Sequence, residues 1–92
     1  MRCAISSRAG QTLARGRLFI QKEEDGELRL MFQSDRGTVV EGGLVADDGD
    51  MTVASQELML QFFTLWRMTD LTLTATSKGA RDEHYLSRPI TY

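Results

Sequence analysis

The stretch Arg17–Phe32, RLFIQKEEDGELRLMF, decides the fold because the pattern of its side chains fixes a register. A two-residue loop in the middle would mix polar and apolar side chains on each face of a hairpin. A three-residue loop at 24–26 avoids this, and Gly26 supplies the left-handed residue that such loops need. The pattern therefore predicts an antiparallel hairpin with four apolar side chains on one face: Leu18, Ile20, Leu30 and Phe32.

Three further stretches are typical of strands. The run 38–45 contains Gly42–Gly43, which predicts a bulge or bend that reverses the facing of the residues after it. The run 71–77, LTLTATS, alternates apolar side chains with threonines and predicts a half-buried strand. The run 84–92 is expected to form the last strand, which Pro89 places at a sheet edge or makes bulged.

The stretch Ser55–Met68, SQELMLQFFTLWRM, fits a helix better than a strand. In a helix its polar residues form a narrow stripe and the apolar ones line the other sides, whereas a strand would place Gln61 and Arg67 among apolar neighbours. Ser55 is an acceptable N-cap for this helix. The chain is thus expected to be an α+β protein, with an antiparallel sheet of about five strands and one amphipathic helix packed on one face.

The composition limits the class of protein. Residues 1–92 suffice for a single compact domain, and 41% hydrophobic with 26% charged residues is ordinary for a soluble globular protein. The longest apolar stretch, Leu58–Trp66, falls well short of the ~20 residues of a membrane-spanning helix. No signal region follows Arg2, and Cys3 is the only cysteine. We therefore expect a cytoplasmic protein with no membrane association.

The net charge of −2 conceals an uneven distribution. Residues 1–22 hold five basic side chains and no acid, whereas residues 23–57 hold ten acids against Arg29 and Arg36. Such segments create an electrostatic field at the protein surface only if folding keeps the basic and acidic segments apart. Strands that lie side by side would neutralise each other instead.

Catalytic and metal-binding patterns are weak throughout. The aspartates near Asp48–Gly49 resemble a polar hairpin turn more than a calcium loop, because the closing glutamate of that loop is missing. His84 is the only histidine, and Cys3 lies near a terminus that is expected to fray, so the two make a poor nucleophile–base pair or zinc site. No glycine-rich loop fits a phosphate cradle. We expect a non-enzymatic protein with no metal and no cofactor.

The favoured hypothesis is an inhibitor or adaptor that binds a protein partner, for example a nucleic-acid-handling machine whose phosphate groove the acids would occupy. The acidic residues that would make this contact are Glu23, Glu24, Asp25, Glu27, Asp47, Asp48 and Asp50. An alternative contact surface is the apolar side of the helix, which could also form a homodimer. Its candidate residues are Met59, Phe63 and Trp66.

Two other functions stay open. The arginine-rich stretch Ile5–Arg17 could grip nucleic-acid phosphates through Arg8, Arg15 and Arg17, with Arg81 and Arg88 as additions, or it could be a solvated lead-in to the folded domain. The lesser alternative is a ligand-binding or enzymatic dimer. Its cleft would be lined by Trp66, Phe63 and His84.

Overall fold

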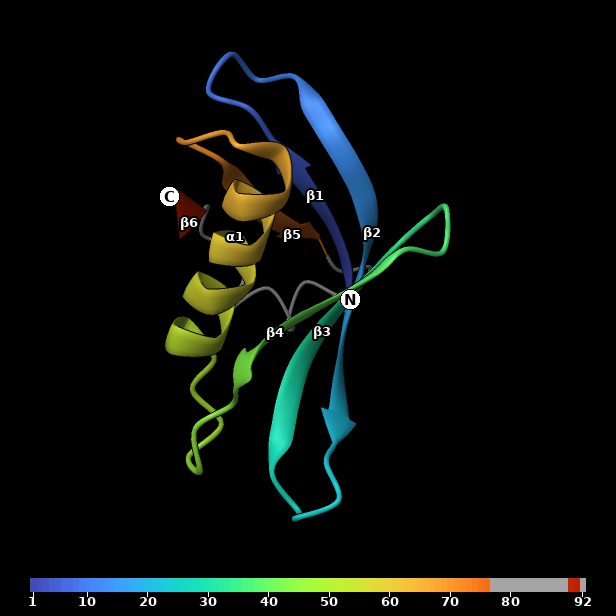
Figure 1. The fold of residues 1–92 in the computed structure, drawn as a ribbon, viewed down its shortest axis with the longest axis vertical. Helices are drawn as coiled ribbons and strands as arrows, with labels where there is room; N and C mark the ends of the chain where they lie inside the picture. The colour runs from blue at the N-terminus through green and yellow to red at the C-terminus, as the bar shows by residue number, and fades with distance from the viewer. Residues whose placement is uncertain (77–89, 92) are drawn as a thin grey trace.

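The computed structural model of the chain describes residues 1–76 and 90–91, which form one sheet and one helix (Figure 1). The elements in chain order are β1 (Arg2–Ser6), β2 (Thr12–Lys22), β3 (Leu28–Ser34), β4 (Val39–Leu44), α1 (Thr52–Trp66), β5 (Thr72–Thr76) and β6 (Ile90–Thr91). The strand order is β4-β3-β2-β1-β5-β6, and every neighbouring pair is antiparallel. The sheet curls around α1, which covers one face, and this confirms the expected α+β class.

The β2–β3 hairpin has the predicted register, with Leu18 opposite Phe32 and Ile20 opposite Leu30. The amide of Glu23 donates to the carbonyl of Glu27 at 2.7 Å, and the loop between them ends at a left-handed Gly26 with φ 90°. Three of the four apolar side chains are buried, but Ile20 is 47% exposed. Ile20 also lies beyond the pairing of β2 with β1, which begins at Arg2 opposite Arg17.

The stretch Ile5–Arg17 belongs to the sheet and is not a free arm. It contains the end of β1, a turn, and the first half of β2. The turn is closed by the amide of Ser7, which donates to the carbonyl of Gln11 at 2.8 Å. The terminus that was expected to fray is held on β2, because the amide of Leu18 donates to the carbonyl of Met1 at 2.8 Å.

The predicted bulge in β4 is confirmed. The pairing with β3 passes from Met31–Glu41 to Arg29–Leu44, so Gly42 and Gly43 together lie opposite one residue of β3. A Cβ atom added to Gly42 would lie 3.0 Å from the Cβ atom of Leu58 in α1. The two glycines therefore let α1 approach β4 more closely than residues with side chains would allow.

The helix was predicted correctly, but it begins earlier than Ser55. It starts at Thr52, whose amide and hydroxyl both donate to Oδ1 of Asp50, at 2.8 and 2.7 Å. Ser55 is buried in the first turns and is not the N-cap, a position that Met51 occupies. The helix ends at Trp66, and its C-cap residue Arg67 has a left-handed φ of 54°. No helix in the described part of the chain has the length and apolar character that crossing a membrane requires.

The core lies between the concave face of the sheet and α1. The ring of Phe62 meets the ring of Phe32 edge-on, with centroids 5.2 Å apart, and lies 4.8 Å from the ring of Trp66. Leu71 and Leu73 point inward as their alternation predicted. The buried residues of this core are Cys3, Ile5, Leu18, Leu30, Phe32, Ala54, Leu58, Met59, Phe62, Leu71 and Leu73.

Only the end of the predicted last strand falls on described residues. Ile90–Thr91 form the short β6, which pairs with β5 at the sheet edge, as expected for this stretch. Pro89 lies outside the described residues, and so does His84.

Candidate functional site

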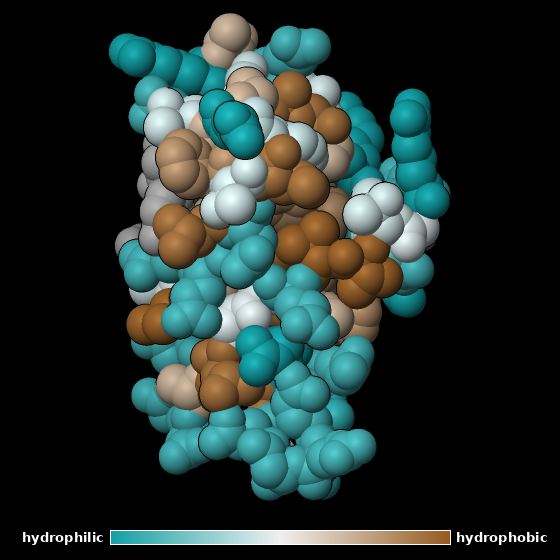
Figure 2. Space-filling model, in the orientation of Figure 1, coloured by the Kyte–Doolittle hydropathy of each residue, from teal (hydrophilic) through white to brown (hydrophobic). Residues whose placement is uncertain are grey.

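Both acidic segments lie at the same end of the molecule. The amide of Val45 donates to the carbonyl of Leu28 at 2.8 Å, so the loop from β4 to α1 starts beside the base of the β2–β3 turn. In Figure 1 the two loops point the same way, toward the bottom of the view, and Figure 2 shows a hydrophilic surface there. We call this surface the acidic end. Its carboxylates are those expected from the sequence: Glu23, Glu24, Asp25, Glu27, Asp47, Asp48 and Asp50.

Basic side chains do little to neutralise this end. Arg29 binds Glu23 through Nε and donates from Nη1 to the carbonyl of Gly42 at 2.9 Å. The hydrogen bond to Glu23 raises the pKa of the Arg29 guanidinium, and the charges of Glu41 and Glu57 raise it further. Arg29 is thus already surrounded by carboxylates, which leaves Lys22 as the other basic residue of the β2–β3 turn.

Three of the seven acids hold the loops in shape. Oδ1 of Asp25 accepts from the amide of Glu27 at 3.0 Å, and Oδ1 of Asp48 accepts from the amide of Asp50 at 2.9 Å. The bonds from Thr52 lower the pKa of the Asp50 carboxyl below its usual range. These are ordinary side-chain contacts of turns and helix starts.

The other acids at this end are differently placed. Glu23 is engaged with Arg29, whereas the side chains of Glu24, Glu27 and Asp47 form no hydrogen bond or ion pair with any described residue. All three are exposed. No three acidic, histidine or cysteine side chains in the described part of the chain are grouped so as to hold a metal ion. The acidic end is therefore a cluster of carboxylates, three of which have no partner among the described residues.

The helix surface differs from the one expected. Met59 is 0% exposed and belongs to the core, so it cannot contact a partner. The helix turns Leu58, Met59 and Phe62 toward the sheet, and the spacing of these positions is that of one helix face. Phe63 is 39% exposed on the neighbouring side, and Trp66 is half-buried against Phe62.

The three arginines expected to bind phosphates lie on two separate surfaces. Arg15 and Arg17 project from β2 on the face away from α1, because the residues that alternate with them, Gly16 and Leu18, are buried. Arg8 lies in the β1–β2 turn, with its guanidinium 3.7 Å from the carboxylate of Asp70 and both groups largely in solvent. Arg81 and Arg88 lie outside the described residues.

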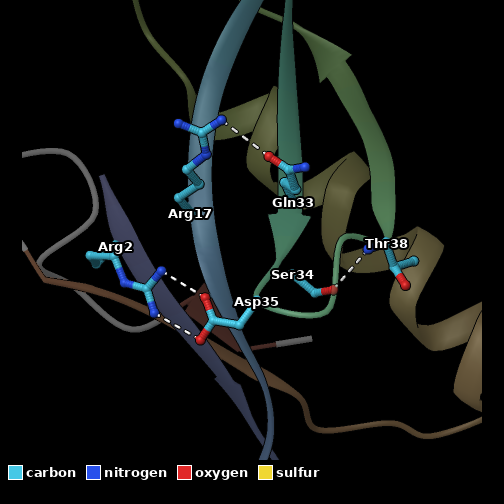
Figure 3. A network of polar contacts seen from close by, with 6 residues as sticks. All are labelled: Arg2, Arg17, Gln33, Ser34, Asp35 and Thr38. Atoms are coloured by element: carbon cyan, nitrogen blue, oxygen red, sulfur yellow. Dashed lines mark hydrogen bonds and ion pairs between the residues drawn. The ribbon is translucent and has the colours of Figure 1, made fainter.

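The outer face of β2 also carries groups that the sequence analysis missed (Figure 3). Arg17 donates to Oε1 of Gln33 at 3.1 Å and lies over the ring of Phe19, 5.4 Å from its centroid. Arg2 of β1 binds Asp35 through two hydrogen bonds, at 2.8 and 2.9 Å. This contact lowers the pKa of the Asp35 carboxyl. The alternation of Arg15, Arg17 and Phe19 was a signal that could have identified this surface.

A groove of about 580 Å³ runs between the start of β2, the β3–β4 turn and the C-terminal half of α1. Its apolar lining consists of Leu13, Ala14, Phe32, Val40, Phe62, Leu65 and Trp66. Polar residues from β2, the end of β3 and the β3–β4 turn complete it: Thr12, Arg15, Ser34, Asp35, Arg36 and Thr38. The ligand cleft expected from the sequence included Trp66 and Phe63, and only Trp66 lines this groove.

Cys3 is not placed for catalysis. Its side chain lies in the core, and burial raises the pKa of the thiol to about 11. At neutral pH the group is therefore a neutral thiol, which is a weak nucleophile.

No protein-family model matches the chain, and no curated protein and no solved structure resembles it.

Proposed function

We propose that this protein works by binding, without catalysis, to a positively charged surface of a larger protein, as an inhibitor or adaptor. The observation that carries the proposal is the acidic end, where two segments about 20 residues apart in the sequence present seven carboxylates together. A groove built for nucleic-acid phosphates is one surface of matching charge.

The two kinds of acid at this end suit that task. Asp25, Asp48 and Asp50 stabilise the turns through hydrogen bonds within them. A surface that is already ordered loses less conformational entropy when it binds. The side chains of Glu24, Glu27 and Asp47 form no such hydrogen bonds and can bind arginines or lysines of a partner. Charge of this kind accelerates association and makes binding sensitive to salt.

The test compares two variants with the same net charge. The first, E24Q/E27Q/D47N, removes the three free carboxylates. The control, A9K/Q11K/T69K, adds three positive charges at exposed positions away from the acidic end. Each tagged protein is used to capture companions from a lysate of its host, with and without nuclease.

The proposal predicts a stoichiometric protein that survives nuclease, is retained by the control and is lost by the first variant. Equal capture by both variants would refute a role for the acidic end. Capture of the partner by E24Q/E27Q/D47N at high salt would also refute this role.

A second candidate function is nucleic-acid binding, supported by Arg15, Arg17 and Phe19 on the outer face of β2. Arginines beside an aromatic ring suit a single strand of nucleic acid. The arginines bind its phosphates, and the ring stacks on a base. It is the weaker candidate because Arg17 is already engaged with Gln33 and the protein as a whole is acidic. Under it, R15Q/R17Q loses binding to a labelled oligonucleotide and E24Q/E27Q/D47N does not.

A further inference from the structure

We propose that the free edge of β4 binds a basic, extended peptide as an added antiparallel strand. In the described part of the chain β4 is an end strand of the sheet and pairs with β3 alone. A groove of about 440 Å³ runs along this edge and is bounded on one side by the C-terminal half of α1. This site is separate from the acidic end and does not depend on the function proposed above.

The backbone of β4 offers hydrogen bonds on its free side. The amide of Ser34 donates to the carbonyl of Thr38 at 2.8 Å, and the amide of Thr38 donates to the hydroxyl of Ser34 at 3.0 Å (Figure 3). The backbone groups of Thr38 therefore face β3, and successive residues of a strand alternate in this direction. The amides and carbonyls of Val39 and Glu41 thus face the groove. Edge groups of this kind are a template for another strand.

The site is short because α1 closes the groove beyond Glu41. The helix packs directly on the bulge, where a Cβ atom added to Gly43 would collide with the carboxylate of Glu57. The lining of the groove on β4 accordingly runs from Val39 to Gly42. Three residues of an added strand can pair with β4, opposite Val39–Glu41.

The helix side of the groove suits an apolar side chain. Val40 packs toward the core, so the peptide residue opposite it also points to the side of α1, where Gln61 and Leu65 line the groove. Leu65 shares the sheet-facing side of α1 with Leu58 and Phe62, yet it is 61% exposed. An apolar side chain placed there would remove part of this surface from water.

The outer side of the edge suits a basic side chain. Val39 and Glu41 alternate with Val40 and lie on the outer face, opposite Gln33 and Met31 of β3. The carboxylate of Glu41 is exposed and forms no hydrogen bond or ion pair with a described residue. A lysine or arginine directly across from it in an added strand makes a favourable pair.

These positions define the peptide. Read from its N-terminus, an antiparallel strand places a basic residue opposite Glu41, an apolar residue opposite Val40 and a β-branched residue opposite Val39. Lys-Leu-Val is the simplest sequence of this kind. β4 itself contains no basic residue, so a second copy of this strand would leave Glu41 without an opposite charge.

The test uses two labelled peptides, acetyl-Ser-Thr-Lys-Leu-Val-Thr-Ser-amide and the same peptide with glutamate in place of lysine. Fluorescence anisotropy measures their affinity for the protein. The lysine peptide is expected to bind with a dissociation constant below about 1 mM, and the glutamate peptide at least about threefold more weakly. E41K should reverse this order.

Two matched pairs of variants locate the site. V39P removes an amide that faces the groove and leaves the pairing with β3 intact, so it should weaken binding at least about tenfold, whereas V39T should change it less than about threefold. L65A should weaken binding more than L60A, because Leu60 is exposed and lies outside the groove. Circular dichroism checks that each variant is folded.

Amide hydrogen exchange identifies the mode of binding. Saturation with the lysine peptide should slow exchange at Val39 and Glu41 at least about tenfold, because these amides gain acceptors in the added strand. Val40 faces β3 already, so its exchange should change much less.

Four results would overturn the proposal. The first is no binding of the lysine peptide up to about 1 mM, and the second is equal affinity for the two peptides. The third is binding without slower exchange at Val39 and Glu41. The fourth is slow exchange there that needs no peptide and grows with protein concentration, which would assign the edge to a second copy.

The acidic end is tested separately. E24Q/E27Q/D47N keeps the edge of β4 and should bind the lysine peptide within about twofold of the wild-type affinity. Loss of binding in this variant would place the peptide at the acidic end and refute the site on β4. Capture of a basic protein by the acidic end does not require the edge of β4, so the two proposals fail separately.

Discussion

The packing of α1 makes a sharp prediction, because Phe62 and Phe63 are neighbours in sequence but lie in different surroundings. Phe62 is fully buried, with its ring against those of Phe32 and Trp66, whereas Phe63 is 39% exposed. The same substitution, phenylalanine to alanine, can thus be made at both positions. Any difference in its cost reports the facing of the helix.

The magnitudes are well separated. Truncation of a fully buried phenylalanine costs about 3–5 kcal/mol, which combines lost burial with the cavity left behind. At Phe63 the expected cost is about 1 kcal/mol or less, since much of that ring is already in solvent. A domain of this length has a total free energy of unfolding of about 5–14 kcal/mol. F62A should therefore lose a large fraction of the stability.

The assay is urea unfolding followed by circular dichroism at neutral pH, with F62A and F63A measured beside the wild-type protein. The expected result is a difference of at least about 2 kcal/mol between the two variants. Costs equal within about 0.5 kcal/mol would refute the assigned helix face. A cost below about 1 kcal/mol at Phe62 would refute its place in the core.

Two further predictions concern ionisable groups. The bond from Arg2 lowers the pKa of Asp35 below its ordinary value of 3.8, so the pair contributes stability above that value and loses it as the pH falls through the lowered pKa. In urea titrations R2Q should be less stable than wild type at neutral pH, and the difference should disappear as the pH falls below the lowered pKa of Asp35; a difference that stays constant with pH would contradict the pairing. Burial raises the pKa of the Cys3 thiol from 9.0 to about 11, which lowers its thiolate fraction at pH ~8 about 100-fold. Alkylation by iodoacetamide should be at least that much slower in the native protein than in urea, and similar rates would show that Cys3 is accessible.

Local patterns predicted most of the fold. The register of β2 and β3 followed from the alternation around Gly26, and Gly42–Gly43 correctly marked the bulge, because these features depend on residues that are close in sequence. The start of α1 was misplaced because Ser55 has the chemistry of a cap. The actual start depends on Asp50, whose carboxylate accepts from the amide of Thr52. The sequence analysis had assigned this carboxylate to a turn or to contact with a protein partner.

Features that depend on distant residues were harder to predict. β1 was missed because RCAIS is short and the residues after it resemble a charged lead-in, while its stability comes from pairing with β2 and β5. The acids of the candidate site were all named from the sequence. Their gathering at one end depends on the strand order, which composition does not encode. Met59 was misassigned because an almost wholly apolar helix leaves its buried side ambiguous.

The central place of β1 has a consequence for synthesis on the ribosome. One neighbour of this strand, β2, follows it directly in the sequence. The other neighbour, β5, pairs Thr76 with Arg2 and emerges from the ribosome only after α1 has been translated. Until then a nascent chain carries β1 as an open edge, with Ile5 still lacking Leu73 beside it. Open strand edges invite pairing with other chains. Ribosome-bound chains that stop before Thr72 should therefore be the form of this protein that depends most on chaperones.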